Sequence, residues 1–223
     1  MKQILIGIIF FLISSHLFSQ QKLTKDEIIK DWNLSSSSQT KDSSIIVNSD
    51  SVLNVRLTKL IDSLQANNID SLIVFSTALP GYSSISKCDT GMFPITSFII
   101  WTKDNISHVK KIKGNCLSEI NKDSLTYLFD FYGKNYKKIE SEVFMPIILS
   151  AQMNSDKSIS YSTSWIDHEP NYSFYYKIGK HQKSFQFCQS YLDNKKSLFH
   201  SYNLNLLAYR WWRQVKREID KIN

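Results

Sequence analysis

The sequence is poor in the two residues that most often make tight turns. It has six glycines and four prolines among 223 residues, whereas a β-sandwich of many short strands needs turn residues at regular intervals. This scarcity argues against an all-β fold of that kind. Hydrophobic residues make up 42% of the chain and aromatic residues 13%, which is ample for a packed core and argues against disorder of the whole chain.

The sequence also lacks the short motifs of common catalytic and metal sites. It contains no Gly-x-Ser-x-Gly, no Gly-rich phosphate loop, no His-Glu-x-x-His and no Cys-x-x-Cys. The spacing of His168, His181, Cys188 and His200 matches no short zinc-binding pattern. We therefore predict no cofactor and no metal, and we assign no catalytic residue.

One triplet, Asp89-Thr90-Gly91, resembles the catalytic loop of aspartic proteases, in which two carboxylates share a proton and activate water. A single copy would need a dimer to supply the second carboxylate. In that family the triplet follows a strongly apolar strand, whereas here it follows a polar, Ser-rich segment. The other interpretation is an Asp-Gly turn. An exported hydrolase that uses Asp89 is therefore the alternative function.

Arginine is scarce although the chain is basic. The formal net charge is +7, and only four of the basic residues are arginines. Lysine is a hydrated point charge, whereas arginine is the usual residue for bidentate phosphate recognition, and the lysines here are interspersed with acidic residues. We predict solubility and mild attraction to anionic surfaces, and no nucleic-acid partner.

The longest apolar run is too short to cross a membrane. It extends from Ile4 to Ile13, is preceded by Lys2 and is ended by Ser14-Ser15-His16, whereas a span needs about twenty apolar residues. The order of basic, apolar, polar and small residues predicts a secretory signal peptide at residues 1–20, cleaved near Ser19/Gln20. We expect a periplasmic or extracellular mature chain without a transmembrane span. An uncleaved membrane anchor is the alternative.

The three cysteines are Cys88, Cys116 and Cys188. Export would place them in an oxidising environment, where an odd number allows at most one internal disulfide. A hairpin predicted over 96–112 brings residues before Pro94 close to those after Lys113, and this favours Cys88–Cys116 as the pair. The alternatives are three buried free thiols and a function that depends on the unpaired thiol.

The order of elements predicts an α+β fold. Thr24 to Glu27 forms a capping box for a short helix over 22–34, and the Ser-rich segment 35–44 indicates a linker. We thus divide the chain into a signal peptide at 1–20, a short helix and linker at 21–44, and a single globular domain at 45–223.

Within that domain, hydrophobic periodicity predicts the following elements: helices at 52–66, 123–143 and 203–222, and strands at 72–78, 96–102, 106–112, 158–165, 172–178 and 183–192. Residues 125–131 also alternate, so a strand is an alternative there. Short connections favour antiparallel pairing, with 106–112 as a polar edge strand. We predict an antiparallel sheet of about five strands with helices packed on one face, in two layers.

The C-terminal helix carries the candidate binding residues. Arg210, Arg213 and Arg217 share one helix face, and Trp212 beside them is a candidate aromatic platform for an anionic partner, a glycan or a lipid headgroup. The alternative is structural: Trp211 packs in the core and the cations favour the helix dipole. The predicted function is a non-enzymatic exported domain that binds a protein or an anionic component of the cell envelope.

Overall fold

The computed structural model describes residues 23–37, 51–79, 88, 95–104, 106–114, 116–122 and 125–222. The predicted signal peptide with its cleavage site and the triplet at Asp89 lie outside these residues. Most of the Ser-rich segment does so too, and the domain boundary at residue 45 stays a prediction.

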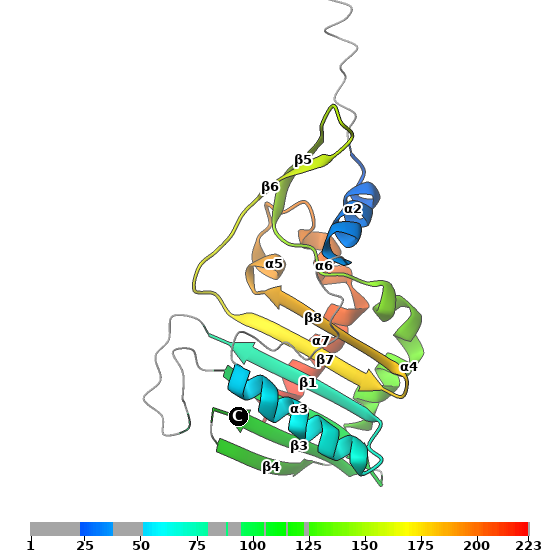
Figure 1. Cartoon of the computed structure of the whole chain (residues 1–223), viewed down its shortest axis with the longest axis vertical. Helices are drawn as coiled ribbons and strands as arrows, with labels where there is room; N and C mark the ends of the chain where they lie inside the picture. The colour runs from blue at the N-terminus through cyan, green and yellow to red at the C-terminus, as the bar shows by residue number, and fades with distance from the viewer. Residues whose placement is uncertain are drawn as a thin grey trace, which may run out of the picture.

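The centre of the molecule is a six-stranded, fully antiparallel sheet, which confirms the predicted α+β class (Figure 1). Its strand order is β4-β3-β2-β1-β7-β8. The bounds are Ser71–Ala78 for β1, Ile95–Lys103 for β2, Ile106–Lys113 for β3, Cys116–Lys122 for β4, Asn171–Ile178 for β7 and His181–Cys188 for β8. Strand β4, which we did not predict, is the edge strand, so the prediction that 106–112 is the edge is wrong.

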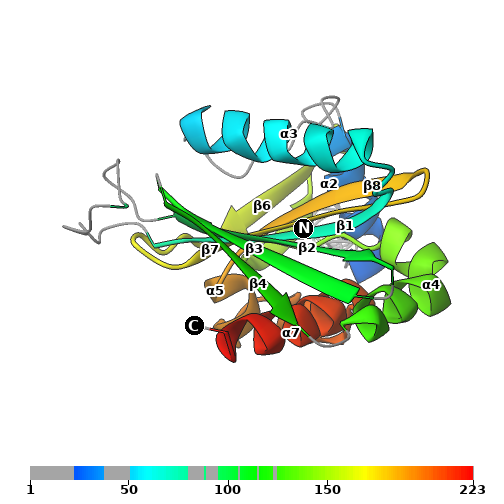
Figure 2. The ribbon, with the colours of Figure 1, turned by 90° about the horizontal axis from the view of Figure 1, so that it is seen from below.

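Helices cover both faces of this sheet, so the prediction of two layers with helices on one face is wrong. Helix α3 (Ser51–Ala66) lies on one face, and α4 (Thr126–Ser141) and α7 (Leu207–Asp220) lie on the other (Figure 2). The physical reason is visible in β1. Leu72 and Val74 pack in the cluster that includes α3, whereas Ile73 and Phe75 pack in the cluster that includes α4 and α7. A strand buried on both faces has a continuous apolar run rather than an alternating one.

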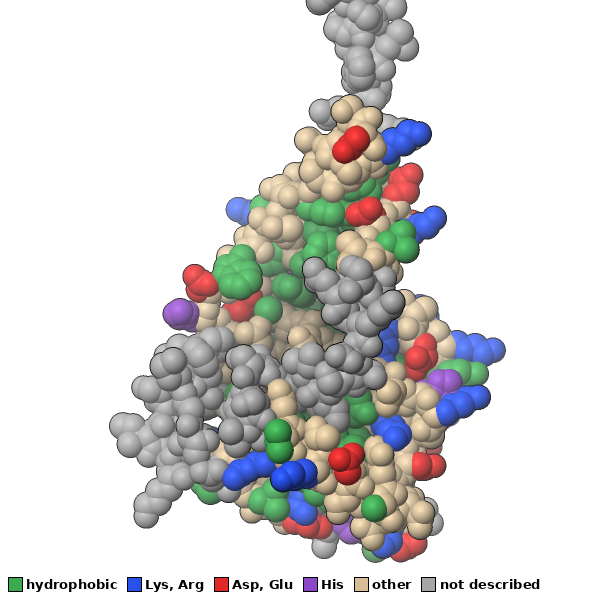
Figure 3. Space-filling view, viewed as in Figure 1, with side chains coloured by type: hydrophobic (Ala, Val, Ile, Leu, Met, Phe, Trp, Pro, Cys, Tyr) green, Lys and Arg blue, Asp and Glu red, His purple; other side chains and the backbone are tan. Residues whose placement is uncertain are grey.

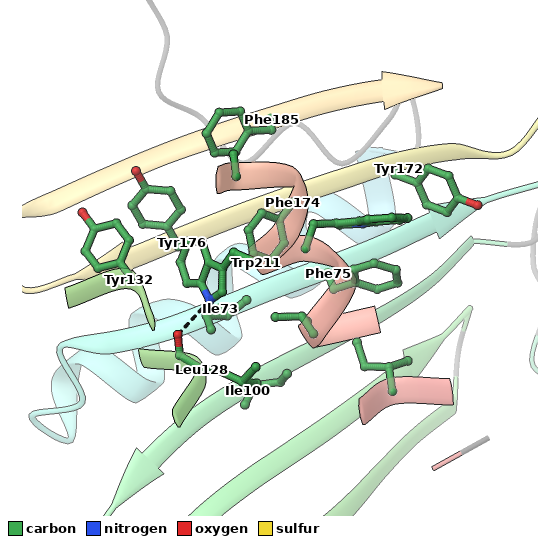
Figure 4. Packing of buried hydrophobic residues seen from close by; sticks show 14 of the residues in the cluster. Ile73, Phe75, Ile100, Leu128, Tyr132, Tyr172, Phe174, Tyr176, Phe185 and Trp211 are labelled. Carbon is green, nitrogen blue, oxygen red and sulfur yellow. Dashed lines mark hydrogen bonds between the residues drawn. The ribbon is translucent and has the colours of Figure 1, made fainter. Parts of the chain in front are cut away.

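Trp211 fixes α7 against the sheet (Figure 4). Its ring is fully buried and forms a T-shaped pair with the ring of Phe174 at a centroid distance of 4.9 Å. Its Nε1 donates a hydrogen bond of 2.7 Å to the carbonyl of Leu128 in α4. The same side chain therefore joins the sheet, α4 and α7.

A second, smaller sheet lies beside the main one. It consists of β5 (Ile148–Met153) and β6 (Ile159–Thr163), with α2 (Lys25–Ser37) next to it (Figure 1). Ile28 of α2 is buried against Met145 and Ile148. The capping box is confirmed, because the backbone N–H of Thr24 donates to the Glu27 carboxylate at 2.8 Å and that of Glu27 donates to Thr24 Oγ1 at 3.3 Å.

The predicted C-terminal helix is divided in two. Helix α6 (His200–Asn205), which follows the short α5 (Ser190–Asp193), ends before Leu206, where the backbone is extended, and α7 begins at Leu207. The cause is distant in sequence: the buried carboxylate of Glu142 accepts hydrogen bonds from the backbone N–H groups of Leu207 at 2.9 Å and Ala208 at 2.7 Å. A carboxylate at this position satisfies free N–H groups and the positive end of the helix dipole.

The predicted disulfide is confirmed, since the sulfur atoms of Cys88 and Cys116 are 2.01 Å apart. Cys116 opens β4 and pairs in register with Lys113, the last residue of β3. The bond therefore lies at the end of the sheet where the candidate site is found.

Candidate functional site

The register of the sheet builds the floor of the candidate site. Thr77, Thr96 and Lys113 are opposite one another on β1, β2 and β3, and Phe75, Phe98 and Lys111 form the next row. Because alternate residues of a strand face the same side, both rows lie on the face that α7 covers. Helix α7 runs beneath the sheet, and its C-terminal end lies away from α4 (Figure 2).

The sheet and the C-terminal end of α7 enclose an open hollow of about 360 Å³. Its walls are strand residues on one side and the last two turns of α7 on the other. The lining consists of Phe75, Thr77, Leu79, Thr96, Phe98, Lys111, Lys113, Pro170, Tyr172, Lys216, Ile219 and Asp220. The ammonium group of Lys111 lies 5.6 Å from the ring centroid of Phe98, a favourable cation–π distance.

A second hollow of about 450 Å³ follows α7 and shares Lys216 and Asp220 with the first. Its lining consists of Tyr209, Trp212, Arg213, Lys216, Arg217, Asp220 and Lys221. We call the two hollows together the basic groove. Lysines of β3 and cations of α7 line it, and Asp220, whose carboxylate lies 2.6 Å from Lys216 Nζ, is the acidic residue among the lining side chains.

The structure brings three of the four predicted binding residues to this groove. Arg213, Arg217 and Trp212 line it, whereas Arg210 is exposed but is not part of the lining. Trp212 is not an aromatic platform, because only 4% of it is exposed and its ring stacks on Phe75 inside the core. The aromatic ring that does lie against an arginine is that of Tyr209, whose centroid is 5.7 Å from the guanidinium carbon of Arg213.

The lysines of β3 are the functional candidates that the sequence analysis missed. Lys111 and Lys113 alternate along one strand, and this Lys-x-Lys pattern is the sequence signal of a basic strand face. The pattern becomes informative only when α7 is known to cross the same face. The packing of α7 on the face of β3, about a hundred residues earlier in the chain, cannot be predicted from local periodicity.

Two polar features of the groove have no internal partner. The hydroxyls of Thr77 and Thr96 form no hydrogen bond with a described residue, whereas on the opposite sheet face Ser76 and Ser97 bond to each other at 2.7 Å. Within the described residues, the buried side-chain polar atom left without a partner is Nε1 of Trp212. Such atoms are uncommon in native proteins and call for an explanation such as a water or a ligand.

A second polar cluster, at the C-terminal end of α4, has a structural role. Glu140 Oε1 accepts hydrogen bonds from the hydroxyls of Tyr132 at 2.7 Å and Tyr176 at 2.6 Å. Burial lowers the pKa of Lys183 to about 8, but its ammonium already donates to the carbonyls of Ile139, Glu140 and Glu142. These bonds use the donors of the ammonium group, so Lys183 caps the carbonyls at the C-terminal end of α4. It is therefore not positioned as a nucleophile.

The environment of the Cys188 thiol favours its protonated form. Cys188 Sγ donates to the Asn171 side-chain oxygen at 2.6 Å, and burial, with the negative charge of Glu169, raises the pKa of the thiol to about 11. Since the thiolate is the nucleophile, a thiol-dependent activity has little support. In the described part of the chain, no group of three or more His, Cys, Asp or Glu residues is arranged to hold a metal ion.

An apolar surface lies away from the groove, beside the small sheet. Hydrophobic side chains gather there over β5, β6 and α2 (Figure 3), and the exposed ones of the sheet and the loop after it include Leu149, Met153, Trp165 and Ile166. Neither a charge pattern nor a neighbouring chain identifies what would cover this surface. The apolar surface therefore supports no function here. Over the described ranges, no helix combines the length and the apolar character needed to cross a bilayer.

Comparison with known proteins gives no family for this chain: no family model, no curated protein and no solved structure matches it. The functional argument therefore rests on the geometry and charge of the groove alone.

Proposed function

We propose that the protein is an exported, non-enzymatic binding domain whose basic groove holds an anionic component of the cell envelope. The observation that supports this most directly is the convergence of Lys111 and Lys113 of β3 with Arg213, Lys216 and Arg217 of α7 on one groove. A concave surface on which positive charges outnumber negative ones, above a low-dielectric core, attracts anionic ligands.

The groove stands on a rigid scaffold. Its sheet wall belongs to strands with continuous antiparallel pairing. Its helix wall is fixed by Trp211 and by the hydrogen bond that the backbone N–H of Ala208, at the start of α7, donates to the Glu142 carboxylate. Walls held in this way lose little conformational freedom when a ligand binds, which favours affinity.

The chemistry of the lining supports binding rather than catalysis. The lining side chains are ammonium and guanidinium groups, the hydroxyls of two threonines and two tyrosines, apolar groups and Asp220, which is paired with Lys216. They include no His or Cys, and they form no nucleophile–base pair of the kind that covalent catalysis needs. Asp89, the candidate residue of the alternative hydrolase function, lies outside the residues that the structure describes, so the structure does not bear on that alternative.

Charge reversal in the groove tests the proposal. The mature protein is titrated by calorimetry at low salt with three anionic probes: oligogalacturonate, oligoglutamate and phosphatidylglycerol vesicles. We expect at least one probe to bind with an affinity that falls as salt rises. The Lys216→Glu/Arg217→Glu variant should weaken that binding at least tenfold, because two attractions become repulsions.

The matched control is Lys59→Glu/Lys180→Glu, which makes the same change in net charge at exposed positions that do not line the groove. It should bind like the wild type. The proposal is wrong if no probe binds, or if the control loses as much affinity as the groove variant.

A further inference from the structure

Two of the four basic side chains that line the second hollow are already neutralised by carboxylates. The ammonium group of Lys216 lies 2.6 Å from the carboxylate of Asp220, and that of Lys221 lies 2.6 Å from the carboxylate of Glu218. These two lysines therefore offer little free positive charge to a ligand. The charge that this hollow can offer belongs to its two arginines.

Arg213 and Arg217 are exposed and, among the residues that the structure describes, neither forms an ion pair or a side-chain hydrogen bond. They are four residues apart on α7, a spacing that places the Cβ atoms about 5–6 Å apart on one helix face. Because both side chains also line the same hollow, they can reach a single group of a ligand together.

Aromatic rings support the guanidinium of Arg213. Its central carbon lies 5.7 Å from the ring centroid of Tyr209. The ring of Tyr209 stacks in turn on the buried ring of Trp212, at a centroid distance of 5.6 Å. A cation on an aromatic face is attracted by the ring, so it loses less side-chain freedom when a ligand binds.

The arginine pair has more donors than a carboxylate can use. Each guanidinium can donate two parallel hydrogen bonds, and the single pair of oxygens of a carboxylate is already occupied by one such fork. A phosphodiester likewise has one pair of charged oxygens. A phosphate monoester has three terminal oxygens and a charge of about −1.5 to −2 at neutral pH, which matches both the donors and the charge of two guanidiniums.

From the unpaired arginines, their shared hollow and this match we infer that the second hollow binds a phosphate monoester. The inference rests on the proposed function and specifies its anionic group. Arg213 and Arg217 each donate a pair of hydrogen bonds to the terminal phosphate oxygens. Such a phosphate occurs both on lipids and on soluble esters, and the experiment distinguishes the two sources.

The test titrates the mature protein by calorimetry at low salt and neutral pH. Three soluble probes are compared: glycerol 3-phosphate is a phosphate monoester, glycerate is a carboxylate and glycerophosphoglycerol is a phosphodiester. Vesicles that contain phosphatidic acid, a lipid phosphate monoester, or phosphatidylglycerol, a lipid phosphodiester, are the other two probes. We expect each monoester that binds to do so at least tenfold more tightly than the diester of the same kind, and glycerol 3-phosphate to bind at least tenfold more tightly than glycerate.

The two monoesters identify the source of the phosphate. Binding of phosphatidic acid vesicles at least tenfold more tightly than glycerol 3-phosphate would support the inference with a lipid as the ligand. Equal or weaker binding of the vesicles would support it with a soluble ester.

The decisive variants are Arg213→Lys and Arg217→Lys, which keep the positive charge and remove the guanidinium fork. Each should weaken binding of the tighter monoester by about fivefold or more, because a lysine donates as a point charge. Arg210→Lys is the matched control, since Arg210 is exposed on the same helix but does not line the hollow. It should bind like the wild type.

The possible failures are distinguishable. The inference is overturned if glycerate or a phosphodiester binds as tightly as the monoesters, or if both lysine variants keep full affinity, and anion binding in the basic groove then still stands. If no anionic probe binds at all, oligogalacturonate and oligoglutamate included, the proposed function falls with it.

Discussion

Among single residues, Trp211 connects three structural parts, since it touches the sheet, α4 and its own helix. We expect Trp211→Ala to lower the free energy of unfolding by about 3–5 kcal/mol, as truncation of a buried aromatic side chain usually does. Trp211→Phe should cost less, because it keeps most of the apolar contact and loses the hydrogen bond to the Leu128 carbonyl. Urea denaturation followed by circular dichroism measures both.

Trp165 provides the control for this prediction. Its side chain is 83% exposed, and substitutions at such positions usually change stability by less than about 0.5 kcal/mol. A loss of several kcal/mol in Trp165→Ala, or none in Trp211→Ala, would contradict the packing described above.

Glu142 accounts for the position at which α7 begins. It is buried and accepts two backbone N–H groups of that helix. We expect Glu142→Gln to destabilise the protein by about 1–2 kcal/mol, because the neutral amide keeps one acceptor and loses the favourable interaction of the charge with the helix dipole. Chemical denaturation at pH 7 gives the value.

A carboxylate on the surface is the comparison. Glu119 on the edge strand is about half exposed and pairs with Lys110 at 3.3 Å. Because exposed ion pairs contribute little, Glu119→Gln should cost less than about 1 kcal/mol. If Glu142→Gln and Glu119→Gln lowered the free energy of unfolding equally, the buried position of Glu142 at the start of α7 would have no special effect.

At the scale of elements, the disulfide connects residues that are 28 positions apart in the sequence. Closing a loop of this length removes entropy from the unfolded chain, so we expect Cys88→Ser/Cys116→Ser to lower the free energy of unfolding by about 3–4 kcal/mol. Thermal unfolding with and without dithiothreitol measures the effect. Reductant should lower the Tm of the wild type and leave that of the double variant unchanged; a wild-type Tm insensitive to reductant would refute the prediction.

The elements that local sequence signals predict well are those whose causes are local. The capping box from Thr24 to Glu27, the β2–β3 hairpin and helix α4 follow from residues a few positions apart. The break between α6 and α7 does not, since Glu142 lies more than sixty residues before it. Strand β4 was missed because its short, largely polar sequence is decided by pairing with β3 rather than by its own periodicity.

The candidate site shows the same division. Exposed arginines on one helix face could be predicted, because helical spacing alone places them together. The burial of Trp212 and the contribution of Lys111 and Lys113 depend on how α7 lies across the sheet. That arrangement is a tertiary property, and no short sequence pattern reports it.

At the scale of the whole molecule, buried tyrosines make stability depend on alkaline pH. Burial and hydrogen bonds to carboxylates raise the pKa values of Tyr132, Tyr161 and Tyr176 above their ordinary value. The native state then holds protons that the unfolded state releases near pH 10. The stability that these tyrosines contribute to the folded protein is therefore lost as pH rises above about 10. Lys183, with a pKa lowered to about 8, acts in the opposite sense between about pH 8 and 10.

We therefore expect the urea midpoint to fall between pH 10 and pH 11.5, with part of the phenolate absorbance at 295 nm appearing only on unfolding. In Tyr132→Phe/Tyr176→Phe the fall should be shallower, since two of the groups responsible are absent. A midpoint that is independent of pH in this range, or an unchanged slope in the double variant, would contradict the assignment.

The position of β1 in the sheet has a consequence for the order of events in folding. One edge of β1 pairs with β2 nearby in the chain, but the other pairs with β7, where Leu72 meets Lys177 more than a hundred residues later. Contacts of such long sequence separation form slowly, because a large loop must close first. A ribosome must therefore make most of the protein, up to β7, before its central strand has both neighbours, so the sheet can be completed only late in synthesis.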